Sequence, residues 1–310
     1  MGTTNAAAPK EIVESCPKCG FQNADEAIEC ARCGVVFGKL AAAPVVEVHA
    51  VAGPPEQQGF GRAEARMLGV AFGAALLANL IPLVATVLSA LATLFHELGH
   101  AVASWILGHP ALPAFDFVYG GGFTHEDDFK PALAVLVGAG WLALGSVLRR
   151  SPRMLVGIGA LAALWLVAVS AAWRRELVIA AMGHVGELIL AAVFLFMALA
   201  NVGWRRPEIE RPLGAFLGCF VQIHTLSFAW KLMHDADFLA WYREGKGGAL
   251  MNDLESVALD LHIHTGVPLA IEDVAGWLFV LALLSFGAAL ALAAFRPRVA
   301  AFRSWLLASR

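Results

Sequence analysis

Long apolar runs separated by short polar breaks fill the chain from Met67 onward, whereas residues 1–66 are polar and rich in Ala, Pro and Gly. About 20 apolar residues are enough for an α-helix to cross a bilayer. We expect spans at 67–107, 131–148, 154–173, 176–202, 213–232 and 274–296. Asn79 and Pro82 interrupt the first stretch, which is either two spans or one span with a re-entrant piece. The pattern predicts an all-α polytopic membrane protein with about six to seven spans.

Composition agrees with this pattern. Apolar residues make up 59% of the chain, charged residues 15%, and the mean hydropathy is +0.68, whereas soluble domains are more polar. A net charge of -3 gives no reason to expect a nucleic-acid partner. The first long apolar run begins only near Met67, which predicts no secretory signal. We therefore expect a multi-pass protein of the cytoplasmic membrane whose N-terminal segment stays in the cytosol.

The placement of arginines bears on orientation, because cytosolic loops are enriched in Lys and Arg. Arginines near the ends of the spans fall on one side if 67–107 crosses once: Arg62, Arg66, Arg149, Arg150, Arg153, Arg205, Arg206 and Arg211, together with the basic C-terminal tail. Arg174 and Arg175 then fall on the other side. If 67–107 crosses twice, the later loops invert, and the sequence leaves both topologies open.

Four of the five cysteines lie in one cluster, CPKCGFQNADEAIECARCGVVF at 16–37. Each of two Cys-x-x-Cys pairs forms a tight turn that aims two thiolates at one metal, and Gly20 and Gly34 permit these turns. The expected ligands are Cys16, Cys19, Cys30 and Cys33. The segment resembles the zinc-ribbon family, which implies a structural zinc ion. A closed four-Cys site has no open position for substrate, so we expect this module to bind a protein partner instead of catalysing a reaction.

A second motif, LFHELGHAVA at 94–103, lies in an otherwise apolar helix. His96 and His100 are four residues apart and share one helix face, so their imidazoles can hold one zinc ion. Glu97 can then take a proton from a zinc-bound water, whose pKa the metal lowers to about 7. Each charged group deep in a membrane costs about 2.5–3.5 kcal/mol, and metal coordination offsets this cost. Gly99 leaves one side of the helix bare, which would let a substrate backbone approach.

A polytopic chain with HELGHA early in its membrane domain resembles the site-2 protease family of intramembrane zinc metalloproteases. The resemblance implies hydrolysis of peptide bonds in or beside the membrane, with a membrane or membrane-proximal protein as substrate. It also implies His96 and His100 as zinc ligands and Glu97 as general base. The family's third ligand is an Asp in a later Leu-Asp-Gly motif, and this sequence contains no Leu-Asp-Gly.

A catalytic zinc ion normally has three protein ligands and an open position, so a third ligand is needed. His184 and Glu187 interrupt the apolar run 176–202 and share a face. Glu187 ranks first as the ligand, with His184 beside the metal as a catalytic oxyanion donor or substrate partner. His184 as the ligand, or a His184–Glu187 pair that only stabilises packing, remain alternatives. Asp253, in a polar segment outside the apolar runs, ranks below Glu187, and Asp116 is a further competing acid.

These observations divide the chain into a zinc ribbon at 1–37, a flexible linker at 38–66 and a transmembrane metalloprotease domain at 67–310. We expect one structural and one catalytic zinc ion. The glycine-rich loop YGGGFTHEDDF at 119–129 is either an edge strand that clamps an extended substrate or an ordinary turn between helices.

The leading hypothesis is a zinc-dependent membrane endopeptidase. A non-proteolytic metal-binding scaffold or transporter that uses the same histidines is the second hypothesis, and it predicts no peptide cleavage by the native protein. A third hypothesis makes the ribbon the main functional part, anchored by an inactive membrane domain.

Overall fold

The computed structural model describes residues 15–16, 18–24, 27–37, 60–116, 121–244 and 251–308, and for 296–308 only the backbone. The chain forms two compact units, Met1–Gln57 and Gln58–Arg310. The predicted ribbon residues 1–14 and the predicted linker residues 38–59 lie outside the described part. The first helix begins at Arg62, before the expected end of the linker.

Two similar turns build the described part of the N-terminal unit. The N–H of Gly20 donates to the carbonyl of Cys16 over 2.8 Å, and the N–H of Gly34 donates to that of Cys30 over 2.9 Å. Both glycines have a φ of 69°, in the left-handed region that disfavours other residues. One antiparallel bridge flanks each turn, Ser15–Gln22 and Glu29–Val36. The prediction that Gly20 and Gly34 permit these turns is confirmed.

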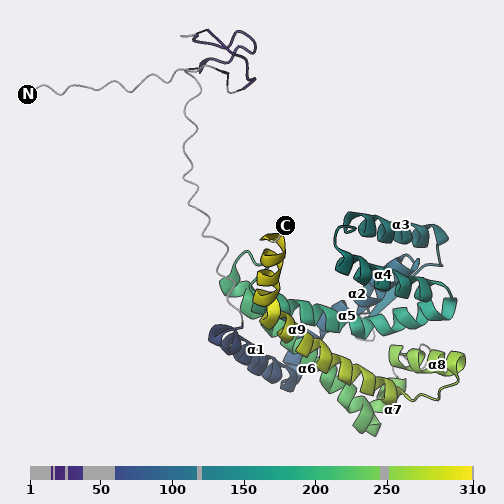
Figure 1. Cartoon of the computed structure of the whole chain (residues 1–310). Helices are drawn as coiled ribbons and strands as arrows, with labels where there is room; N and C mark the ends of the chain where they lie inside the picture. The colour runs from purple at the N-terminus through teal and green to yellow at the C-terminus, as the bar shows by residue number, and fades with distance from the viewer. Residues whose placement is uncertain are drawn as a thin grey trace, which may run out of the picture. The chain divides into compact units, whose positions relative to one another are not determined.

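The second unit is mostly helical (Figure 1). Within the described residues, six helices are long and apolar enough to cross a membrane: α1 (Arg62–Leu80), α2 (Pro82–Leu107), α4 (Pro152–Val169), α5 (Ala172–Ala200), α6 (Pro207–His234) and the Ile271–Phe295 part of α9 (Ile271–Ala308). Three are shorter: α3 (Pro131–Val147), which is also apolar, α7 (Ala236–Glu244) and α8 (Asp253–Thr265). The multi-pass architecture predicted from the apolar runs is confirmed at this level.

Contacts along the helices define the direction in which each one runs. Helix α2 is antiparallel to α5, and α6 is antiparallel to α9, whereas α1 is parallel to α6. Between α2 and α5 the neighbouring residues are His96–Glu187 and His100–Ile179. Between α6 and α9 they are Gln222–Ser285 and Met233–Gly276. Between α1 and α6 they are Glu64–Arg211 and Asn79–Phe220. The stretch 62–107 therefore starts at the end of the bundle where α5 finishes and leads to the end where α5 begins. The two helices of this stretch meet at Ile81.

Close backbone packing joins α2 to α5. A Cβ on Gly99 would lie 2.1 Å from the carbonyl oxygen of Met182, and a Cβ on Gly186 would lie 2.6 Å from the Cα of Gly99. The expectation that Gly99 leaves room for a substrate is therefore wrong, because the backbone of α5 occupies that side. The small residue instead lets the two helices approach closely enough for their side chains to meet.

The second unit is mostly helical, as predicted, but it also contains one element that the all-α prediction did not include. An antiparallel hairpin lies between α2 and α3, with β1 (Ala111–Asp116) paired to β2 (Gly121–Glu126). Two side chains of α2 anchor it: Trp105 Nε1 donates to the carbonyl of Ala111 over 2.7 Å, and Ser104 Oγ donates to Glu126 Oε1 over 2.6 Å. Within 119–129, the structure shows a strand at Gly121–Glu126, whereas 119–120 lie outside the described residues; the clamping of a substrate by this strand stays a prediction.

Candidate metal centre

The two motif histidines lie on one face of α2, as the four-residue spacing predicts. Their Nε2 atoms are 3.0 Å apart. The Nδ1 atom of His100 lies 2.7 Å from the carbonyl oxygen of Ile179, and this contact orients the ring from the α5 side. A histidine that donates through one ring nitrogen presents the other as a lone pair. The two Nε2 atoms are thus aimed at one point.

Asp253, the first residue of α8, reaches the same point. Its Oδ2 atom lies 2.7 Å from Nε2 of His96 and 3.1 Å from Nε2 of His100. Burial opposes its ionisation, but hydrogen bonds with His100 and His96 hold the pKa of Asp253 well below its usual value. The three donor atoms lie within 4.8 Å of one another. Two imidazoles and one carboxylate are a ligand set typical of catalytic zinc.

Glu187 contacts His96 from the opposite side of the ring. Its Oε1 atom lies 2.7 Å from Nδ1 of His96 and 3.3 Å from Nδ1 of His184, and its Oε2 atom accepts a hydrogen bond of 2.9 Å from Thr225. His96, His184 and Glu187 form a second group of donors within 4.8 Å. The structure therefore brings both Glu187 and Asp253 to His96, each at a different ring nitrogen.

The strand β2 packs against Glu97. The hydroxyl of Thr124 donates to Glu97 Oε2 over 2.8 Å, and Glu97 is only 6% exposed. A Cβ on Gly122 would lie 2.4 Å from Cγ of Glu97. The hairpin thus fixes the position of this carboxylate, and a Cβ at position 122 would push it away.

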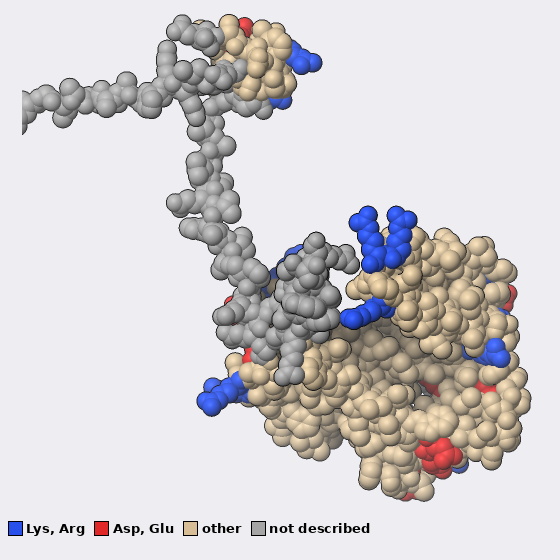
Figure 2. All heavy atoms as spheres, viewed as in Figure 1, with Lys and Arg blue, Asp and Glu red and all other residues tan. Residues whose placement is uncertain are grey.

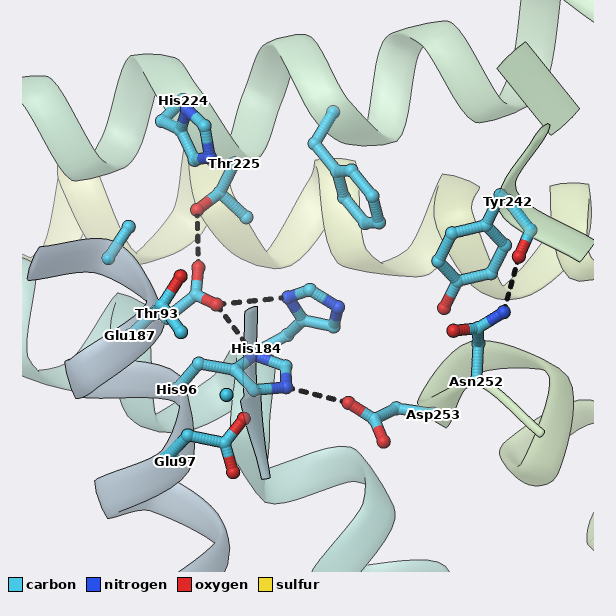
Figure 3. A pocket seen from close by; sticks show the side chains of 13 residues that line it. Thr93, His96, Glu97, His184, Glu187, His224, Thr225, Tyr242, Asn252 and Asp253 are labelled. Atoms are coloured by element: carbon cyan, nitrogen blue, oxygen red, sulfur yellow. Dashed lines mark hydrogen bonds and ion pairs between the residues drawn. The ribbon is translucent and has the colours of Figure 1, made fainter. Parts of the chain in front are cut away.

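A cavity of about 230 Å³ opens between these groups (Figure 3). The residues that line it come from α2, β2, α5, α6 and α7 and from the start of α8: Ala92, Thr93, His96, Glu97, Gly122, His184, Glu187, His224, Thr225, Phe228, Tyr242, Asn252 and Asp253. Figure 3 shows His184 between Glu187 and the open part of the cavity, facing Asp253 and Tyr242. The cavity therefore contains all the residues of the predicted membrane site except His100.

Tyr242 is a cavity residue that sequence reasoning missed, since no motif surrounds it. Burial, followed by the charge of Asp253, raises the pKa of its phenol above the usual value, so the hydroxyl keeps its proton. The side-chain amide of Asn252 donates to the carbonyl of Tyr242 and links α7 to the segment that carries Asp253. Asp116, the other competing acid, ends β1, and its side chain lies outside the described part.

The four cysteines of the N-terminal unit also converge. The sulfurs of Cys16 and Cys33 are 3.6 Å apart, as are those of Cys19 and Cys30. All four lie within 4.8 Å of one another, so the group could hold one metal ion.

Comparisons of the chain with protein-family models, with curated proteins and with solved structures find no match.

Proposed function

We propose that the chain is a zinc-dependent membrane endopeptidase that hydrolyses peptide bonds in or near the bilayer. The observation that carries this proposal is the convergence of His96, His100 and Asp253 beside Glu97, in a cavity of a multi-pass protein. In the site-2 protease family, which the chain resembles, the third zinc ligand is the Asp of a Leu-Asp-Gly motif. Asp253 would be the third ligand here, although it is followed by Leu254 and not by Gly.

The choice of Asp253 over Glu187 as third ligand rests on geometry. Only the group with Asp253 uses both motif histidines, through Nε2 atoms that face each other. Glu187 then accepts the Nδ1 proton of His96, which is the pairing of carboxylate and histidine that commonly orients zinc ligands. A three-residue ligand set leaves a position open for chemistry.

The residues around this position divide the catalytic work. Zinc held there would supply a Lewis acid that activates water and polarises a carbonyl group. Glu97, held by Thr124, accepts the proton of the attacking water and delivers it to the leaving amine. His184 and Tyr242, on the other wall of the cavity, are placed to donate hydrogen bonds to the oxyanion or to the substrate backbone.

The N-terminal unit has a separate role in this proposal. Zinc bound by Cys16, Cys19, Cys30 and Cys33 would stabilise its two turns, because so short a segment has little core of its own. The arginines at the start of α1 favour the cytosol for the residues that precede it, in the cytoplasmic membrane. There the ribbon would bind a protein partner.

Glu97→Gln separates the proposed function from its rivals, because it removes the base and keeps the side chain's volume. We expect cleavage of a fluorogenic peptide library in detergent micelles to fall by about 10²–10⁴-fold, with zinc content unchanged. Glu208→Gln, an exposed glutamate of α6, is the matched control and should cleave like the native chain. A native chain that binds zinc and cleaves no peptide in the library would favour the scaffold or transporter.

A further inference from the structure

The helix directions sort the charged residues between the two ends of the membrane unit. Arginines dominate the end where α1, α4 and α6 begin, which we call the arginine face: Arg62, Arg66, Arg149, Arg150, Arg153, Arg205, Arg206 and Arg211. Helix α9 leads toward the same face, and Arg296, Arg298 and Arg303 follow its apolar part. Figure 2 shows Lys and Arg side chains projecting beside α1 and at the junction of α3 with α4.

Acidic residues dominate the opposite end, where α2, α4 and α6 finish, which we call the acidic face. They are Asp127, Asp128, Glu176, Asp235, Asp237, Glu244, Asp253, Glu255, Asp260, Glu272 and Asp273. Figure 2 shows a group of Asp and Glu atoms in the region of α7. The two ends of one bundle thus carry opposite charge.

Among the described residues, three arginines on the acidic face disagree with this sorting, and the structure gives each a local partner. Arg243 of α7 lies with its Nη2 atom 3.7 Å from Glu272 Oε2. Arg175 Nη1 donates to the carbonyl of Val169 over 2.9 Å, and its guanidinium lies 4.1 Å from the ring centre of Phe129. Arg174 Nη1 donates to Ser170 Oγ over 2.9 Å. Arg174 and Arg175 therefore stabilise the turn between α4 and α5, where the last carbonyls of α4 need partners.

The candidate metal cavity is bordered by elements of the acidic face. Three of the elements that line it are not membrane spans: β2 follows α2, and α7 and α8 follow α6, so all three attach at that face. The side chain of Asp253 is 29% exposed, whereas that of Glu187 is 7% exposed. About 16 Å of helix separates His96 from the end of α2, so the site lies inside the bundle, and the more exposed of its two carboxylates, Asp253, is on the side of the acidic face.

Cytosolic loops are the ones enriched in Lys and Arg. We infer that the acidic face is the non-cytosolic one, and that the metal cavity takes its substrate, a polypeptide segment exposed outside the cytosol, from that side. The cleavage of the bound segment rests on the proposed function, whereas the direction of access is argued from helix direction and charge. The catalytic motif would then be inaccessible to segments that remain in the cytosol.

Two matched cysteine variants test the orientation. Asp128 lies in the turn before α3 on the acidic face, and Glu208 lies in the first turn of α6 on the arginine face; both are exposed acids. The full chain is placed in right-side-out membrane vesicles and treated with a membrane-impermeant maleimide, with the unsubstituted chain as background. We expect Asp128→Cys to be labelled at once and Glu208→Cys only after the vesicles are permeabilised. The reverse pattern, or equal labelling of both before permeabilisation, would overturn the inference.

A third variant tests access to the cavity itself. Thr93→Cys places a thiol in the cavity lining, one helical turn before His96. We expect a small impermeant methanethiosulfonate to modify it in right-side-out vesicles and not in inside-out vesicles, and zinc to slow the reaction. Modification from the cytosolic side alone would contradict the inference. Modification from outside that zinc does not slow would leave the access route standing and count against the metal site of the proposed function.

Discussion

His96 is the residue on which both carboxylates of the site converge. Nε2 faces Asp253 and Nδ1 faces Glu187, each at 2.7 Å. A neutral imidazole binds a metal ion through one ring nitrogen and carries its proton on the other. An acceptor next to Nδ1 favours the tautomer with the proton on Nδ1, which leaves Nε2 free to bind the metal. Glu187 is thus a positioning residue in our proposal, and Thr225 holds its second oxygen in place.

Glu187→Gln tests this role, because it replaces the charged acceptor with a neutral amide of the same size. We expect the zinc affinity of the membrane site to fall by about 10–100-fold, with full occupancy restored at higher zinc concentration. Competition with a chromophoric chelator measures the change. Glu176→Gln, an exposed glutamate of the same helix, serves as the control. Complete loss of zinc from the membrane site at every zinc concentration would instead indicate that Glu187 is a direct ligand, as the sequence analysis predicts.

Local spacing predicts part of this site and not the rest. His96, Glu97 and His100 lie within two helical turns, so the period of the helix is enough to place them together. Asp253 is 157 residues from His96, and no Leu-Asp-Gly marks it, so only the tertiary structure brings it to the histidines. Glu187 could be singled out because an ionisable residue inside an apolar run needs a partner. Which nitrogen of His96 it meets is not encoded in that pattern.

At the scale of elements, the hairpin β1–β2 connects the glycine-rich loop to the chemistry of Glu97. The sequence alone left a strand and a turn open, because the strand depends on anchors from α2 that periodicity does not show. Once the hairpin is in place, Gly122 lies against the Glu97 side chain with no space for a Cβ, whereas a Cβ on Gly121 would meet nothing within 4 Å. Neighbouring glycines of one strand therefore differ in what they contribute.

Gly122→Ala should displace Glu97 without touching the metal ligands. A misplacement of about 1 Å in a catalytic group costs about 10²-fold in rate, so we expect peptide cleavage to fall by that order while zinc content is unchanged. Gly121→Ala is the matched control and should cleave like the native chain. Equal rates for both variants would mean that the hairpin does not position the base.

At the scale of the whole molecule, the sequence predicts the order of the parts and the membrane spans better than their directions. Apolar runs mark the spans because length and composition alone decide whether a helix can cross a bilayer. The stretch 67–107 could not be interpreted in the same way, since an apolar run of about forty residues fits one broken crossing as well as two. The pairs Glu64–Arg211 and His96–Glu187 show where α1 and α2 lie in the bundle, and both are long-range contacts.

The zinc content of the purified full-length chain tests the two-site proposal most directly. We predict about two zinc ions per native chain, one for each group of ligands. The double variant Cys16→Ser/Cys19→Ser and the single variant Asp253→Ala should each retain about one, and the triple variant should retain none. If Asp253→Ala binds as much zinc as the native chain, Asp253 is not a ligand. If the double cysteine variant binds none, the membrane unit has no metal site, and the proposed peptidase chemistry fails with it.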